Sequence, residues 1–143
     1  MIEMNRKNAN PAEHSAPPLM ESSAACGFPS PAEQYVESPL DLNTLLVRKP
    51  AATFFVRATG ESMRDAGIRP GDILVVDRSL TPVDGAIVIA CVDNEFTVKY
   101  LRKQGRAVAL EAAAPGYPTL HFGEGMELRI FGVVTACIHQ FVR

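Results

Sequence analysis

From residue 52 onward, short apolar runs alternate with tight turns, and this rhythm constrains the fold more than any other feature of the chain. The turns fall at residues 69–72, 84–85, 93–94 and 104–105, where Gly, Pro, Asp or Asn occurs. Stretches rich in strand-forming residues occupy positions 53–58, 73–76, 86–92, 95–101, 107–110, 128–130 and 133–138. Short strands at such regular spacing, with almost no helix, predict an all-β sandwich or barrel.

The first part of the chain has a different composition. Residues 1–26 contain no aromatic side chain and three prolines, and they are rich in Ala, Ser, Asn and Glu. Such a segment buries too little apolar surface to offset its chain entropy. We therefore expect a flexible N-terminal arm over residues 1–26 and a β-rich domain over residues 27–143. Prolines at 29, 31, 39 and 50 leave room for one short helix, around residues 41–47, with Asp41 as its cap.

Charge and composition argue against several classes of protein. The chain has 14 Lys and Arg against 16 Asp and Glu, a formal net charge of −2, so strong direct DNA binding is not expected. Its longest uninterrupted apolar run has seven residues, 86–92, whereas a membrane-spanning helix needs about 20. Charged residues also interrupt the N-terminus, so neither a membrane segment nor a signal peptide is expected.

The three cysteines, at positions 26, 91 and 137, are an odd number without a Cys-x-x-Cys pair. They predict neither a disulfide framework nor a metal site. The three histidines are scattered as well, so we expect no metal and no cofactor. Without a secretion signal, the cytoplasm, where thiols stay reduced, is the expected location.

Ser62 lies in the sequence Gly-Glu-Ser-Met, just after the first strong strand. A serine that follows Gly-x at a strand end can expose its hydroxyl beside free backbone N–H groups, which a nucleophile and an oxyanion hole require. The alternative is that Ser62 serves the turn itself, as most turn serines do.

Lys99 is a lysine inside an apolar strand, residues 95–101. It could be an edge-strand lysine that blocks aggregation. It could instead be a desolvated amine, because burial among the neighbouring apolar residues would lower its pKa from the usual value of about 10.4. Such an amine can act as a general base toward a serine, in a pair that needs neither His nor Asp.

The third signal is the small-residue stretch Ala-Ala-Cys-Gly at residues 24–27, where the expected arm joins the expected domain. Small residues can lie extended in a narrow cleft. This boundary is therefore a geometrically possible site of peptide-bond cleavage.

Together, these segments resemble the UmuD-type members of the LexA-like family of self-cleaving serine peptidases. The resemblance runs from about residue 26 to the C-terminus. It rests on segments in the family's order: residues 26–32 and 35–37 at the cleavage region, 60–63 around the serine, 71–77 in the following strand, 95–99 in the lysine strand and 131–135 in the last strand.

The resemblance implies that Ser62 is the nucleophile, Lys99 the general base and Cys26-Gly27 the scissile bond. It implies a small LexA/UmuD-like β domain that forms a homodimer. It also implies a function in the SOS response: the RecA nucleoprotein filament on single-stranded DNA would stimulate self-cleavage. The shortened dimer would then join a UmuC-type DNA polymerase subunit that copies damaged DNA.

Three other interpretations differ in what they require. A LexA-like transcriptional repressor needs an N-terminal helix-turn-helix domain, and residues 1–26 show no helical apolar period. A signal peptidase, which uses related Ser-Lys chemistry, needs a membrane anchor, which is not expected here. A non-catalytic dimerising β domain would not need Ser62 and Lys99, although their presence does not prove catalysis.

Overall fold

The computed structural model describes residues 16–20, 37–123 and 127–142, and its contacts divide the chain into two units, Met1–Leu45 and Leu46–Arg143. In the first unit, strand β1 (Pro18–Met20) pairs antiparallel with strand β2 (Glu37–Pro39). Helix α1 (Leu42–Leu46) follows directly. No helix in these described ranges is long and apolar enough to cross a membrane.

The helix expected near residue 41 is present, and its cap is the one that the sequence indicates. Asp41 Oδ1 accepts hydrogen bonds from the backbone N–H groups of Asn43, at 2.9 Å, and Thr44, at 3.4 Å. Strand β1 was not expected, because it lies within the segment that we interpreted as a flexible arm. A strand of only three residues is too short to leave a clear local pattern, so the sequence carries no sign of it.

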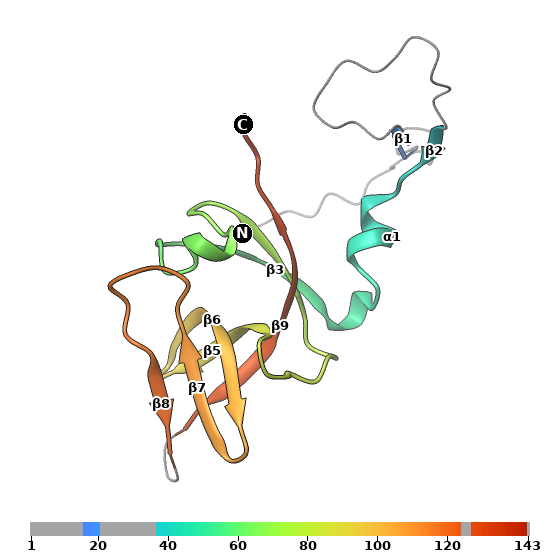
Figure 1. The fold of residues 1–143 in the computed structure, drawn as a ribbon. Coiled ribbons are helices and arrows are strands. Elements are labelled where there is room, and N and C mark those ends of the chain that lie inside the picture. The colour runs from blue at the N-terminus through green and yellow to red at the C-terminus, as the bar shows by residue number, and fades with distance from the viewer. Residues whose placement is uncertain (1–15, 21–36, 124–126, 143) are drawn as a thin grey trace. The chain divides into compact units, whose positions relative to one another are not determined.

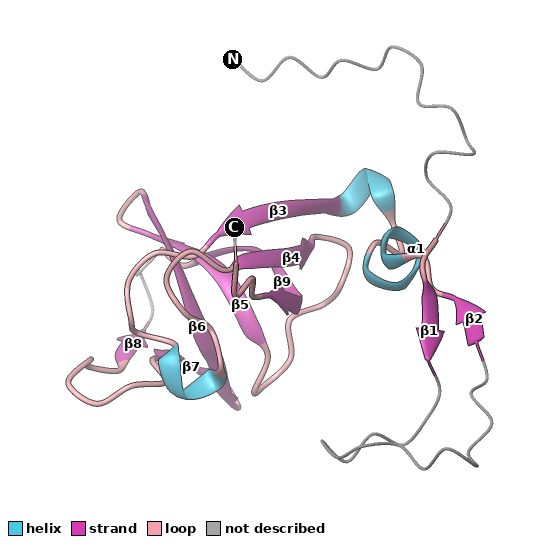
Figure 2. Ribbon diagram, turned by 90° about the horizontal axis from the view of Figure 1, so that it is seen from above, coloured by secondary structure: helices cyan, strands magenta, loops and turns pink. Residues whose placement is uncertain are grey.

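The second unit is an antiparallel sheet of seven strands in the order β3-β4-β9-β5-β6-β7-β8 (Figures 1 and 2). Its strands are β3 (Thr53–Arg57), β4 (Ile73–Asp77), β5 (Ile87–Val92), β6 (Glu95–Gln104), β7 (Ala107–Glu111), β8 (Leu120–Phe122) and β9 (Arg129–Ile138). The all-β prediction is therefore confirmed. In the order of the sheet, β9 and β5 lie between the β3–β4 pair and the strands β6, β7 and β8.

The sequence analysis was wrong about the last strands. It expected separate strands at residues 128–130 and 133–138, but β9 is one strand that runs through Gly132. Its register shifts against β4 between Val75 and Val76 and against β5 between Ile89 and Ala90. In a sequence, a glycine within a run of strand-forming residues resembles the end of a strand. Gly132 instead lies inside β9, where the strand is bulged and packs closely against β4. The short edge strand β8 was missed.

Gly132 allows β9 to lie close to β4. A Cβ atom at this position would lie 2.6 Å from Val76 Cγ1 and 3.2 Å from the carbonyl oxygen of Asp77. Val76 is fully buried, so its side chain has no free space into which it can move. The absence of a side chain at Gly132 is therefore a requirement of the packing.

Apolar side chains cover both faces of the sheet, in two buried clusters. The alternation along β5 sends Ile89 into the first cluster and Val88 and Ala90 into the second. The first cluster contains Ala58, Met63, Ile68, Leu74, Val76 and Ile89, and the second contains Val88, Ala90, Leu101 and Leu110. The unbroken apolar run at residues 86–92 thus reflects a central strand that is buried on both sides.

We predict that Gly132→Ala lowers the free energy of unfolding by about 1–3 kcal/mol, the usual effect of over-packing a core. Urea denaturation measures this change. Gly123→Ala is the control, because a Cβ at that position would meet no atom within 4 Å. The control should change stability by no more than about 0.5 kcal/mol. Equal unfolding midpoints for the two variants would contradict the packing argument.

Candidate active site

Ser62 lies in a loop that leaves the end of β3 and returns at the start of β4. The two ends of the loop are joined, because Ala58 N–H donates to the carbonyl oxygen of Asp72 at 2.7 Å and Gly71 N–H donates to that of Ala58 at 2.8 Å. Gly60, two residues before Ser62, has a φ of 78°. Glycine adopts this left-handed conformation without strain, so it lets the chain turn here.

The loop is also held beside Ser62 itself. Ala113, in the segment after β7, donates its N–H to the carbonyl oxygen of Ser62 at 2.7 Å, and its own carbonyl accepts from Asp65 N–H at 2.7 Å. The next side chain, Met63, is 3 % exposed and belongs to the first apolar cluster. Backbone pairing on one side and a buried neighbour on the other therefore restrain the serine.

Lys99, on β6, reaches this loop. Its Nζ donates to Ser62 Oγ at 2.9 Å and to Thr97 Oγ1 at 3.0 Å. Both Lys99 and Ser62 are half-buried. Burial removes water from the amine, and this desolvation lowers the pKa of Lys99 below the usual value for lysine.

The source of this desolvation differs in part from the expected one. Phe96, one of the apolar residues near Lys99 in the sequence, remains 63 % exposed, and its ring packs edge-on against Phe131 with 4.8 Å between centroids. Thr97 lies on the same strand face as Lys99, since strand residues two apart point the same way. The loop of Ser62 supplies the other contact of the amine.

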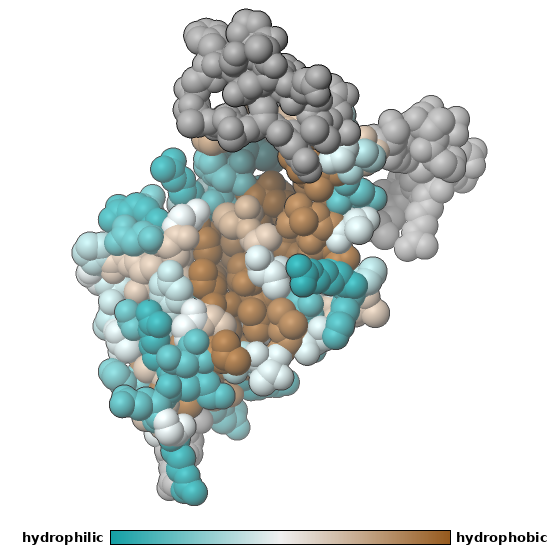
Figure 3. Space-filling view, turned by 45° about the vertical axis from the view of Figure 1, so that its right-hand side comes forward, coloured by the Kyte–Doolittle hydropathy of each residue, from teal (hydrophilic) through white to brown (hydrophobic). Residues whose placement is uncertain are grey.

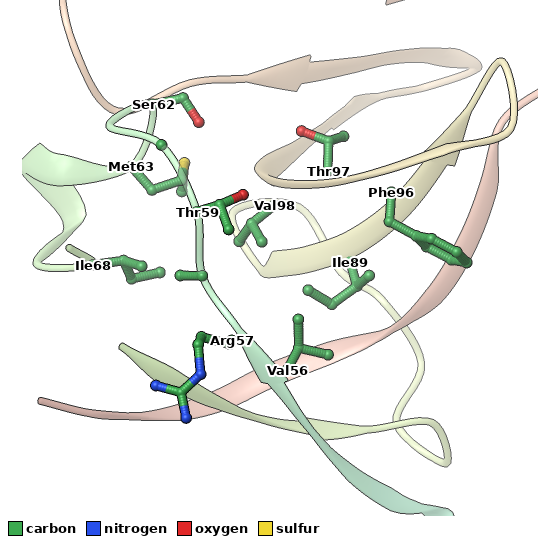
Figure 4. A pocket seen from close by; sticks show the side chains of 12 residues that line it. Val56, Arg57, Thr59, Ser62, Met63, Ile68, Ile89, Phe96, Thr97 and Val98 are labelled. Carbon is green, nitrogen blue, oxygen red and sulfur yellow. The ribbon is translucent and has the colours of Figure 1, made fainter. Parts of the chain in front are cut away.

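A cavity of about 310 Å³ lies next to Ser62 (Figure 4). Its lining includes the apolar side chains of Val56, Met63, Ile68, Ile89 and Val98. Figure 4 shows the hydroxyl groups of Ser62 and Thr97 at the same end of this lining. The lining also includes the polar residues Arg57, Thr59, Ser62 and Thr97, so polar and apolar groups both face the cavity. A cavity of this mixed character suits an extended peptide whose backbone needs hydrogen-bond partners and whose side chains are small or apolar.

The arrangement has the two parts that nucleophilic catalysis requires. A hydroxyl and an amine within hydrogen-bond distance can exchange a proton, and an amine with a lowered pKa is neutral more often than a free lysine. Among the described residues, no group of three or more His, Cys, Asp and Glu side chains could hold a metal ion.

The structure brings Ser62 and Lys99 together, whereas Cys26 and Gly27 lie outside the described residues. The predicted scissile bond thus stays a prediction. The sequence analysis missed Thr97 as a partner of the amine, although the two-residue period of a strand could have indicated it. It also missed Ala113, for which the sequence carries no signal.

Comparisons with known proteins place the chain in a family. A family model described as Peptidase S24-like matches residues 18–135. Protein SamA of Salmonella typhimurium is 52 % identical over 126 residues, which cover 88 % of this chain and 87 % of SamA. Protein MucA of Escherichia coli is 46 % identical over 123 residues, 85 % of this chain and 83 % of MucA.

A more distant relative is the LexA repressor of Vibrio atlanticus. It is 36 % identical over 117 residues, which cover 81 % of this chain and 56 % of the repressor. The matches to SamA and MucA thus extend over most of both proteins, whereas the match to LexA covers little more than half of the repressor. The chain therefore belongs to the Peptidase S24-like family, as a UmuD-like member with a serine-peptidase type of activity and a LexA/UmuD-type function in the SOS response.

Proposed function

We propose that the chain cuts itself between Cys26 and Gly27, with Ser62 as the nucleophile and Lys99 as the general base. The observation that carries this proposal is the 2.9 Å contact between Lys99 Nζ and Ser62 Oγ. The neighbouring cavity of about 310 Å³ supports it, because a cleaved peptide needs a cleft beside the nucleophile.

In the first half of the reaction, neutral Lys99 takes the proton of the Ser62 hydroxyl while Oγ attacks the carbonyl carbon of Cys26. Backbone N–H groups of the Ser62 loop stabilise the oxyanion of the tetrahedral intermediate. The bond between the Cys26 carbonyl carbon and the Gly27 nitrogen then breaks. The ammonium of Lys99 gives its proton to the departing Gly27 amine, and Cys26 is left as an ester on Ser62.

In the second half, Lys99 takes a proton from a water molecule, which attacks the ester carbonyl. The C–O bond to Ser62 breaks, and the proton held by Lys99 returns to Ser62 Oγ. Thr97 keeps the amine aimed at these oxygens, because its own Oγ1 accepts a hydrogen bond from Nζ at 3.0 Å. The net change is hydrolysis of one peptide bond, without a cofactor.

Cleavage would remove residues 1–26 and leave a β-rich product of residues 27–143. On the strength of the UmuD-like relatives, we assign the trigger to the RecA filament on single-stranded DNA. The product forms a homodimer that joins a UmuC-type polymerase subunit in the cytoplasm.

Several large apolar side chains are more than half exposed, including Phe55, Val83 and Phe96, and Figure 3 shows apolar residues gathered on one face. Such exposed apolar surface is typical of protein interfaces.

We predict that Ser62→Ala and Lys99→Ala each reduce the rate of self-cleavage by at least about 1,000-fold, because either change breaks a nucleophile–base unit. The assay incubates the full chain with RecA, single-stranded DNA and a nucleoside triphosphate, then determines product mass and N-terminal sequence. Lys103→Ala, an exposed lysine on the same strand, is the control and should keep the normal rate. Normal cleavage by Ser62→Ala, or a new N-terminus other than Gly27, would contradict the proposal.

We predict that the rate of unstimulated self-cleavage rises with pH and levels off. The rate follows the neutral fraction of Lys99, and desolvation lowers the pKa of its amine, so the midpoint should lie below about 10.4. A pH–rate profile of the full chain without RecA measures this midpoint. Lys99→Arg should be inactive throughout, because a guanidinium stays protonated. A rate that is constant between pH 6 and 10 would exclude Lys99 as the base.

A further inference from the structure

A second group of polar side chains lies where the end of β9 passes the start of β4. Asp72, at its centre, is 3 % exposed. Its Oδ1 contacts His139 Nδ1 at 2.5 Å. Its Oδ2 accepts hydrogen bonds from Arg69 N–H at 2.8 Å and from Cys137 Sγ at 3.3 Å. The carboxylate therefore has three donors, and two of them come from the C-terminal end of the chain.

The other buried aspartate of the described residues provides a contrast. Asp77, 7 % exposed, is satisfied within its own turn, where the backbone N–H and the hydroxyl of Ser79 donate to its Oδ1 at 2.7 and 2.5 Å. Asp72 instead bonds to side chains 65 and 67 residues further along the chain. Its side chain thus connects separate parts of the fold, whereas Asp77 only shapes a local turn.

The backbone of Asp72 closes the base of the Ser62 loop. Its carbonyl oxygen accepts the N–H of Ala58 at 2.7 Å, and Ala58 lies four residues before Ser62. Ala58 is itself 6 % exposed and packs in the first apolar cluster. A shift of Asp72 would therefore move the strand end from which the Ser62 loop begins.

The surroundings of Asp72 favour the charged form of its carboxylate. Burial is the largest influence and raises the pKa of Asp72, but the hydrogen bonds from Arg69 N–H, His139 and Cys137 together hold that pKa below its usual value. Burial and the neighbouring carboxylate raise the pKa of Cys137 to about 11, so its sulfur keeps the proton that it donates. At neutral pH, Asp72 is therefore a charged acceptor and the Cys137 thiol is a neutral donor.

We propose that Asp72 and His139 are positioning residues for the reaction of Ser62 and Lys99. Their contact holds the C-terminal end of β9 against the base of the Ser62 loop. This inference rests on the proposed self-cleavage. Neither residue touches the reacting atoms. Their contact keeps Ser62 Oγ within 2.9 Å of Lys99 Nζ and keeps water away from the amine.

The first test is His139→Ala in the full chain, with the unstimulated pH–rate profile as the readout. The side chain of His139 is 35 % exposed, so its loss should leave the chain folded. We expect the plateau rate to fall by about tenfold or more, because small displacements of reacting groups slow a reaction strongly. The midpoint should move to higher pH, since a loosened Ser62 loop shields Lys99 less. Loss of stability alone would not move this midpoint.

Two further variants at this end of the chain separate the hydrogen bond from other effects. His139→Asn should restore most of the rate, because an asparagine amide nitrogen can donate from about the position of Nδ1. Phe141→Ala removes the edge-on ring contact with His139, whose centroid distance is 5.0 Å, and leaves the pair with Asp72 intact. Phe141 is 91 % exposed, so this control should keep the wild-type rate and midpoint.

Asp72→Ala and Asp77→Ala form a second matched pair, since each removes a buried carboxylate. If both variants fold, only Asp72→Ala should lower the plateau and raise the midpoint. If Asp72→Ala does not fold, the variants His139→Ala and His139→Asn test the positioning role by themselves. A folded His139→Ala with the wild-type rate and midpoint would overturn the positioning role and leave the proposed function standing, provided that Ser62→Ala is inactive. Normal cleavage by Ser62→Ala would overturn both.

Discussion

The passage of β9 between β4 and β5 is the contact on which the rest of the second unit depends. It joins the β3–β4 pair to the four strands β5 to β8, so that a single sheet carries both halves of the site. Ser62 follows β3, and Lys99 lies on β6. The bulges of β9 and the missing side chain of Gly132 make this close crossing possible. Core packing, rather than local sequence, therefore controls the distance between the serine and the lysine.

The candidate site depends on a balance between burial and access. A fully buried lysine would lose its charge easily but could not meet a substrate, and a fully exposed one would keep a normal pKa. Lys99 is half-buried, with two hydroxyl oxygens within 3.0 Å of its amine. The amine is desolvated enough for its pKa to fall, and the adjoining cavity leaves room for a peptide.

The loop of Ser62 is held at two places. Beside the serine, Ala113 pairs with its backbone, and at the base, Asp72 joins the start of β4 to the end of β3 and to the C-terminal end of β9. A nucleophile is effective when its supporting residues are locked by packing and hydrogen bonds. For the proposed nucleophile, Ser62, part of that support comes from Ala113, which lies far from it in sequence.

Local features of the sequence were sufficient for much of the fold. Turn residues and apolar runs located β3 to β7 to within a few residues, and Asp41 marked the start of α1. These predictions succeeded because turn chemistry and strand propensity act over a few neighbouring residues. The strands β1 and β8 have only three residues each and form by pairing with β2 and β7. The sequence analysis failed at these places because so few residues leave no local pattern, and close packing explains Gly132 within β9.

The same division applies to the candidate site. Residue types and their order, together with the family resemblance, identified Ser62 and Lys99, which are 37 residues apart in the chain. Only the tertiary structure decided that their side chains meet at 2.9 Å and that His139 contacts Asp72 at the base of the Ser62 loop. The physical reason is that these contacts join residues that are 37 and 67 positions apart in the chain, where strand order and burial set the distances and no local pattern records them.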